Sequence, residues 1–243
     1  PRTRAILRAV ASAHPARETL ILVLERANSA VEQCPDDVEL RYIRALLSYD
    51  LGRWEQASDD LTRLIELEPN GPFVADARFM LGIAATRLGR YDEASEHYRL
   101  FIEESPWPRE RAVGLTNRAE TRIVVERLEE ALVYLRGALA NFPSYEMAYF
   151  GLAVVFDRLG EESLALDVMR RGLSVGQGFS MLEEDDVFYV PEWEIHYYLA
   201  LAHEAMGEWA RARTQWAAFL TRGGASGPWA QRATAHIERL DRR

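Results

Sequence analysis

Apolar and polar positions alternate with helical spacing along most of the chain, and residues 75–106 show the pattern most clearly. Apolar residues recur through the first half of this stretch at the spacing of one helix face, and the run ends at Leu88-Gly89. A second helical run begins at Tyr91 and ends before Pro106, which cannot continue a helix. The stretch therefore predicts two amphipathic helices joined by a tight turn at Gly89-Arg90.

Small residues recur at regular intervals, as expected where two helices approach each other closely. In this hairpin Gly82 and Ala94 are the small residues predicted at the helix crossing. Ala94 belongs to a series whose intervals are 37, 37, 34 and 47 residues. The longer last interval predicts an insertion at residues 176–193. The members of the series are Ala57, Ala94, Ala131, Ala165 and Ala212.

The recurrence divides the chain into hairpin units. We expect a degenerate first repeat at residues 1–35, with helices at Arg4–Ser12 and Arg17–Gln33. A helix at residues 228–240 has a polar outer face, so we expect it to cap the apolar end of the stack. Complete repeats are predicted at residues 38–70, 74–106, 110–143, 146–175 and 194–222.

These hairpins resemble tetratricopeptide repeats. The family pattern has a Leu-Gly pair, an aromatic residue, a small Ala, a second aromatic residue and a closing Pro. In this chain those positions are Leu81-Gly82, Tyr91, Ala94, Tyr98 and Pro106. The resemblance covers nearly the whole chain. It implies an all-α fold in which one domain forms a right-handed superhelical solenoid of helix-turn-helix repeats with a C-terminal capping helix.

Three features depart from the repeat pattern. Arg41 and Arg44 occupy positions that are usually apolar, and we expect their stems to lie on apolar surface with the charged ends in water. Glu126 stands at a turn where other units have Gly. Within the insertion, Ser180–Glu183 predicts a capping box that opens a short helix, and Val187–Pro191 is expected to be extended.

The resemblance also implies where a partner binds, because the first helices of such hairpins line a concave groove that holds peptide segments. Tyr42, Phe79 and Phe150 fall at equivalent positions and are the expected aromatic anchors. Phe188 and Tyr189 of the insertion are expected to edge or close this track. The predicted groove residues are Tyr42, Leu46, Tyr49, Asp76, Phe79, Ile83, Asn117, Glu120, Phe150, Val154, Asp157, Tyr197, Leu201 and Glu204.

Charge narrows the class of partner. The net charge of the chain is −9, which argues against a nucleic acid, because phosphate binding requires a basic face. The outward positions of the first helices carry seven acidic residues and two arginines. We therefore expect a protein partner whose apolar segment is flanked by Arg or Lys. The carboxylate clamp of the chaperone-binding members of the family is absent, since Asn117 alone is of the right kind.

No group of residues predicts catalysis, a metal site or a cofactor. His196 and His203 share one helix face but lie seven residues apart, whereas the HExxH metal-binding pair needs i, i+4 spacing and a third ligand. The acidic run Glu183–Asp186 lacks the ligand spacing of a calcium loop. Cys34 is the only cysteine, which excludes an intrachain disulfide. We expect no enzymatic activity.

The sequence does not determine the cellular compartment of the protein. No apolar run reaches the roughly 18 residues of a membrane span. The chain begins at Pro1 and not at Met, so we expect a processed or trimmed product. A cytoplasmic location is slightly favoured, and a periplasmic or lipid-anchored one stays open for the same reason.

The expected function is binding of a peptide or helical segment of a protein partner, as an adaptor or scaffold. One alternative is an assembly factor of a bacterial cell-envelope machine, because the secretin pilotins of type IV pilus systems are similar in size and repeat number. The other alternative is a self-assembling scaffold, a homo-oligomer in which the groove receives a neighbouring subunit.

Overall fold

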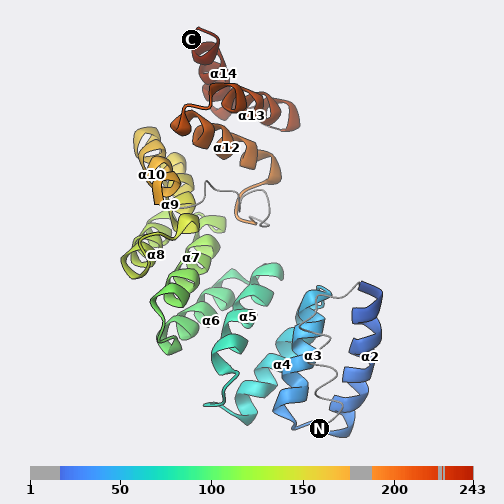
Figure 1. Ribbon diagram of the computed structural model, residues 1–243. Coiled ribbons are helices and arrows are strands. Elements are labelled where there is room, and N and C mark those ends of the chain that lie inside the picture. Colours follow the sequence, from blue (N-terminus) through green and yellow to red (C-terminus); the bar gives the residue numbers. More distant parts are fainter. Residues whose placement is uncertain (1–16, 176–187, 224–225, 227, 243) are drawn as a thin grey trace. The chain divides into compact units, whose positions relative to one another are not determined.

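The computed structural model describes residues 17–175, 188–223, 226 and 228–242 (Figure 1). Every regular element in this part of the chain is a helix, which confirms the all-α prediction. The expected helix Arg4–Ser12, the capping box Ser180–Glu183 and the acidic run Glu183–Asp186 lie outside the described residues.

The helices form two compact units, one ending at Gly114 and the other beginning at Leu115, within α7. The single-domain arrangement stays a prediction. The helix bounds are α2 (Arg17–Gln33), α3 (Val38–Asp50), α4 (Trp54–Leu67), α5 (Val74–Arg87), α6 (Tyr91–Glu104), α7 (Pro108–Val124), α8 (Leu128–Asn141), α9 (Glu146–Arg158), α10 (Glu162–Val175), α12 (Glu192–Met206), α13 (Trp209–Arg222) and α14 (Pro228–Asp241).

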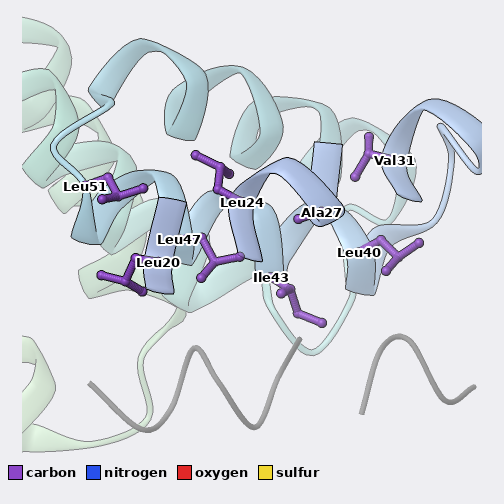
Figure 2. Close-up of a cluster of buried hydrophobic side chains, with 8 residues drawn as sticks. All are labelled: Leu20, Leu24, Ala27, Val31, Leu40, Ile43, Leu47 and Leu51. Carbon is purple, nitrogen blue, oxygen red and sulfur yellow. The ribbon is translucent and has the colours of Figure 1, made fainter. Parts of the chain in front are cut away.

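In the first unit each helix packs against the next one along the chain, from α2 to α6. The helix expected at Arg17–Gln33 is present as α2, and its apolar face packs on α3. Figure 2 shows the buried cluster that these two helices and the following turn form. Its members are Leu20, Leu24, Ala27, Val31, Leu40, Ile43, Leu47 and Leu51.

Small side chains lie where the helices of each hairpin cross, as the sequence predicts. All five alanines of the series, from Ala57 to Ala212, are completely buried. Gly82 on α5 faces the ring of Tyr98 on α6 so closely that an added Cβ would lie 2.5 Å from a ring carbon. A backbone approach of this kind leaves no room for any side chain at Gly82.

The turns inside the hairpins use the left-handed backbone region. Gly52, Gly89, Gly160 and Gly207 have φ values between 71° and 82° there. The α7–α8 turn reaches the same conformation with Glu126, at φ 58°. A residue other than Gly is strained in this region by roughly 1–2 kcal/mol. Glu126 at this turn therefore raises the conformational free energy of the folded backbone.

The arginines at apolar positions of α3 do not point into water, and this part of the prediction was wrong. Both bind the carboxylate of Asp60 on α4, which is completely buried. Arg44 donates to both oxygens, with Nε–Oδ2 at 2.6 Å and Nη2–Oδ1 at 2.7 Å. Arg41 Nη1 donates to Oδ1 at 2.9 Å. Because two guanidinium groups surround one carboxylate, the charge of Asp60 is compensated inside the hairpin.

The second unit repeats the pattern, with α8 on α9, α9 on α10, α10 on α12, and α12 on α13. Helix α14 packs on α13 as the expected C-terminal helix. Its inner stripe includes Ala233, which is completely buried. Arg232 of this helix donates to Asp157 Oδ1 on α9 at 2.9 Å. His236 is buried and hydrogen-bonded to Glu204 Oε1 on α12 at 2.7 Å. Polar contacts therefore hold α14 in addition to apolar ones.

The close approach at Gly82 is open to a direct test. Gly82→Ala should destabilise the protein by about 1–3 kcal/mol, because Tyr98 has to move to admit a methyl group. Gly137→Ala on α8 is the matched control, since its added Cβ would lie at an ordinary 3.5 Å from Leu115. That change should be neutral or stabilise by about 0.5–1 kcal/mol. Equal unfolding free energies for the two variants in urea titrations would contradict the packing described.

The buried ion group on α3 and α4 leads to a second prediction. Asp60→Asn should destabilise the protein by about 3–5 kcal/mol, because two guanidinium groups lose their compensating charge. Asp59→Asn changes the exposed neighbour on the same helix and should stay within about 0.5 kcal/mol of the parent. Denaturant unfolding of both variants would measure the difference, and a small loss in Asp60→Asn would show that the charge is not needed.

Candidate partner-binding surface

The predicted groove residues of the first unit lie on α3 and α5 and stay partly open to solvent. Asp76 is exposed, whereas the apolar and aromatic members are half-buried. They rest on the two apolar clusters beneath them and do not fill the interior. We call this set the α3–α5 surface. It consists of Tyr42, Leu46, Tyr49, Asp76, Phe79 and Ile83.

Contacts across the α3–α5 surface fix the orientation of its side chains. The ring of Tyr42 stacks on Phe73 with centroids 4.5 Å apart, and its hydroxyl donates to Asp76 Oδ2 at 3.3 Å. Tyr49 packs edge-on against Trp54 at 5.1 Å. Burial raises the pKa of Tyr49, and Arg87 opposes the rise. Phe73 is not among the residues predicted from the sequence, although an aromatic residue just before an amphipathic helix is a signal that could have identified it.

Phe79 packs against its own hairpin more extensively than we expect for a side chain that anchors a partner. Its ring packs 4.9 Å from Phe101 and 5.9 Å from Tyr98, both on α6. Much of its apolar area therefore stabilises its own hairpin, and only the rest faces outward.

The predicted residues of the second unit are mostly covered, which corrects the expectation of an open row there. Phe150, Val154, Tyr197 and Leu201 are completely buried. Glu120 and Asp157 are also buried, while Asn117 and Glu204 are half-buried. Side chains without exposed area have no surface to offer to a partner.

The chain covers part of this row with its own residues. Phe150 packs against Tyr198 of α12 at 5.5 Å and against Tyr189 of the insertion at 6.0 Å. Tyr189 is buried, and Phe188 packs edge-on against it at 5.8 Å. Residues 188 and 189 form a turn, so the expected extended conformation was wrong for them. Tyr189 lies within the row and does not merely edge it.

Two predicted acidic residues are used inside the second unit. Asp157 Oδ1 accepts from the Tyr197 hydroxyl at 3.1 Å as well as from Arg232. Glu204 Oε1 accepts from Trp216 Nε1 at 2.7 Å and also contacts His236. Burial alone would raise the pKa of Glu204, but its bonds to His236 and Trp216 outweigh that effect and lower it. Glu204 is therefore engaged within the unit, and Asp157 is engaged through its Oδ1 atom.

The second unit has a pocket of about 390 Å³ where the end of α9 meets the first turns of α12 and α14. Its lining combines charges of both signs with two indole rings. Burial raises the pKa values of Asp157 and Glu194, although nearby arginines oppose the shift. The pocket is lined by Glu126, Asp157, Arg158, Gly160, Trp193, Glu194, Ser226, Trp229 and Arg232.

The two histidines considered as metal ligands have different partners. His196 Nδ1 lies 2.7 Å from Gln215 Oε1, and His203 Nδ1 lies 2.8 Å from Glu208 Oε2. Across the described residues, no three His, Cys, Asp or Glu side chains gather in a way that could hold a metal ion. Among the described helices, none combines the length and apolar character needed to cross a membrane.

The raised pKa of Glu194 predicts a pH dependence of stability. A carboxyl whose pKa is higher in the folded state binds protons more tightly there than in the unfolded state. Its contribution to stability is therefore full below the unfolded pKa of about 4.3. That contribution is lost as the pH rises through the folded pKa. Glu194→Gln should lack this loss. The difference in Tm between Glu194→Gln and the parent should therefore grow from pH 4 to pH 7, as followed by circular dichroism.

Glu161→Gln, at an exposed position of the same unit, is the control and should show a smaller change in that difference. A Tm difference for Glu194→Gln that does not change with pH would contradict a raised pKa for this carboxyl.

The fold is shared with proteins of known structure. PilW, described as a widely conserved type IV pilus biogenesis factor, is 15% identical with a TM-score of 0.63, over 96% of this chain and 99% of that one. MamA from Desulfovibrio magneticus RS-1 is 15% identical with a TM-score of 0.61, over 72% of this chain and 96% of that one. YrrB, described as a TPR protein with an unusual peptide-binding site, is 15% identical with a TM-score of 0.58, over 73% and 84%.

These identities are low, so the similarities show the fold alone. No curated protein matches the chain. Two sequence models of the family do match, one at residues 42–106 and 116–177 and the other at residues 194–222. Both are described as tetratricopeptide repeat, and together they cover more than half of the chain. Repeats of this kind serve generally as protein–protein interaction modules. The chain belongs to the tetratricopeptide repeat family.

Proposed function

We propose that the chain is an adaptor or scaffold that binds a segment of a protein partner on the α3–α5 surface. The observation that carries the proposal is a difference between the two units. The α3–α5 surface keeps a row of half-buried apolar side chains at first-helix positions, whereas the corresponding side chains of the second unit are buried. Contiguous apolar area that stays partly exposed is typical of binding surfaces.

The charge of the surface indicates the chemistry of the partner. Asp76 and Asp50 are exposed at its edges, and Glu39 is half-buried on the same helix as Tyr42. An apolar segment with flanking Arg or Lys complements this arrangement, since opposite charges raise the association rate and disfavour acidic competitors. An amphipathic helix and an extended segment both present such a pattern.

Tyr42 is the best candidate for the central anchor. Its ring is held between the stack on Phe73 and the bond to Asp76, so little conformational freedom remains to be lost on binding. Pre-ordered aromatic side chains of this kind often contribute about 2 kcal/mol or more at the centre of an interface.

A second proposed role is that of an assembly factor for a cell-envelope machine. It is favoured by one comparison, in which PilW aligns over nearly the full length of both chains. A component of such a machine also needs a surface for protein segments, so this role makes the same demand on the α3–α5 surface.

The test begins with a partner segment selected on the intact chain from a random peptide library. The selected peptides should be apolar with flanking Arg or Lys. Tyr42→Ala combined with Leu46→Ala should weaken their binding at least tenfold, measured by fluorescence anisotropy, because two anchoring side chains are removed. Asp76→Arg should weaken binding more at low salt than at high salt, since exposed charges are screened.

Asp59→Arg and Val133→Ala serve as controls, because both sites are exposed and lie on second helices. Neither should change the affinity of the selected peptides appreciably. Retained binding in the Tyr42 and Leu46 double variant would move the site away from the α3–α5 surface. Light scattering that grows with protein concentration in the parent, and is abolished in the double variant, would favour a second copy of the chain as the occupant.

A further inference from the structure

The pocket at the end of α9 belongs to a different unit from the α3–α5 surface and has a different chemistry. Its volume of about 390 Å³ falls in the range of roughly 300–1,000 Å³ that is usual for small-ligand sites. Its walls include two guanidinium groups, three carboxyl groups and two indole rings. This lining differs from that of an apolar groove. The hydrogen-bond partners of each charged group indicate which class of ligand would fit there.

Arg158 is a nearly buried cation without a short acceptor among the described residues. Its side chain is 14% exposed. Its nitrogens lie 3.3 Å from the Tyr189 carbonyl oxygen, 3.4 Å from that of Ile123 and 3.5 Å from Glu126 Oε1. Charge-assisted bonds to oxygen are usually about 2.7–2.9 Å long, so all of these contacts are weak. Its contact with Glu194 Oε2 is longer still, at 3.6 Å.

The carboxyl groups beside Arg158 have oxygens that lack hydrogen-bond donors among the described residues. Within the described part of the chain, Glu194 Oε2 and Asp157 Oδ2 are buried without a hydrogen-bond partner. Arg232 satisfies only the other oxygen of Asp157, at 2.9 Å. The pocket therefore has a cation that lacks a good acceptor next to carboxyl oxygens that lack donors.

The mixture of charges selects between classes of ligand. An anion placed against Arg158 would meet Glu194 and Asp157, and a cation placed against Glu194 would meet Arg158 and Arg232. A neutral group that carries an acceptor next to a donor satisfies both sides without an unpaired charge. An amide has this arrangement, and its flat face also suits the indole walls of Trp193 and Trp229.

We propose that this pocket binds a neutral amide group, either the carboxamide of an Asn or Gln side chain or a backbone amide of a peptide. The amide oxygen accepts from Arg158, and the amide N–H donates to Glu194. Trp193 and Trp229 supply the aromatic part of the wall around the group.

The experiment uses the intact ¹⁵N-labelled chain and follows indole N–H signals by NMR, with Trp193→Phe and Trp229→Phe to assign them. The probes are N-acetyl-glutamine methylamide, N-acetyl-alanine methylamide and the glutamate and lysine analogues of the first. If the side-chain carboxamide is the bound group, the glutamine probe should shift the Trp193 and Trp229 signals at a concentration at least fivefold lower than either charged analogue. An alanine probe as effective as glutamine would identify the backbone amide as the source, and a weaker one the side-chain carboxamide.

Variants test the assigned contacts. Arg158→Met should raise the midpoint concentration of the glutamine probe at least fivefold, whereas Arg170→Met, at an exposed site on α10, should leave it unchanged. Arg158→Lys keeps the positive charge, so it provides a second test if the Met variant does not fold. It should give a midpoint concentration between those of the parent and the Met variant. The proposal is overturned if a charged analogue binds more tightly than glutamine, or if Arg158→Met and the parent respond equally.

Discussion

The structure depends on how closely the two helices of each hairpin approach each other. The buried alanines from Ala57 to Ala212 and the glycine at Gly82 leave room for that approach, and aromatic side chains such as Tyr98 fill the space around it. A single hairpin cannot bury its apolar faces, so neighbouring hairpins must stack. The spacing of the small residues therefore determines both the shape of each repeat and the faces that remain for stacking or binding.

The two units handle buried charge in different ways. In the first unit Asp60 has short bonds from two arginines, and this group acts as a closed internal support for α3 and α4. Among the described residues of the second unit, Asp157 is bonded on one oxygen and the contacts of Arg158 are long. Closed groups of this kind add rigidity, whereas incompletely bonded groups at a cavity are suited to accept a ligand.

Most of the fold could be predicted from the sequence because it depends on local, periodic signals. Helix lengths, the hairpin turns and the buried alanines follow from spacing within about 40 residues. The roles of Arg41 and Arg44 could not be predicted, because their partner Asp60 lies on another helix and no pattern links them. The burial of Phe150 was also missed, since Tyr189 comes from an insertion outside the repeat. The burial of predicted site residues could not be foreseen where side chains from non-equivalent positions cover them.

At the Glu126 turn, a substitution that increases stability would also alter ligand binding in the pocket. Four other hairpin turns use Gly at this backbone conformation, and a protein engineer seeking a more heat-resistant chain would choose Gly here as well. That choice would relieve the strained backbone but remove a carboxylate from the rim of the pocket, 3.5 Å from Arg158. A stabilised version made in this way would have two carboxyl groups in place of three beside its two arginines, so the pocket would discriminate less strongly against anionic ligands.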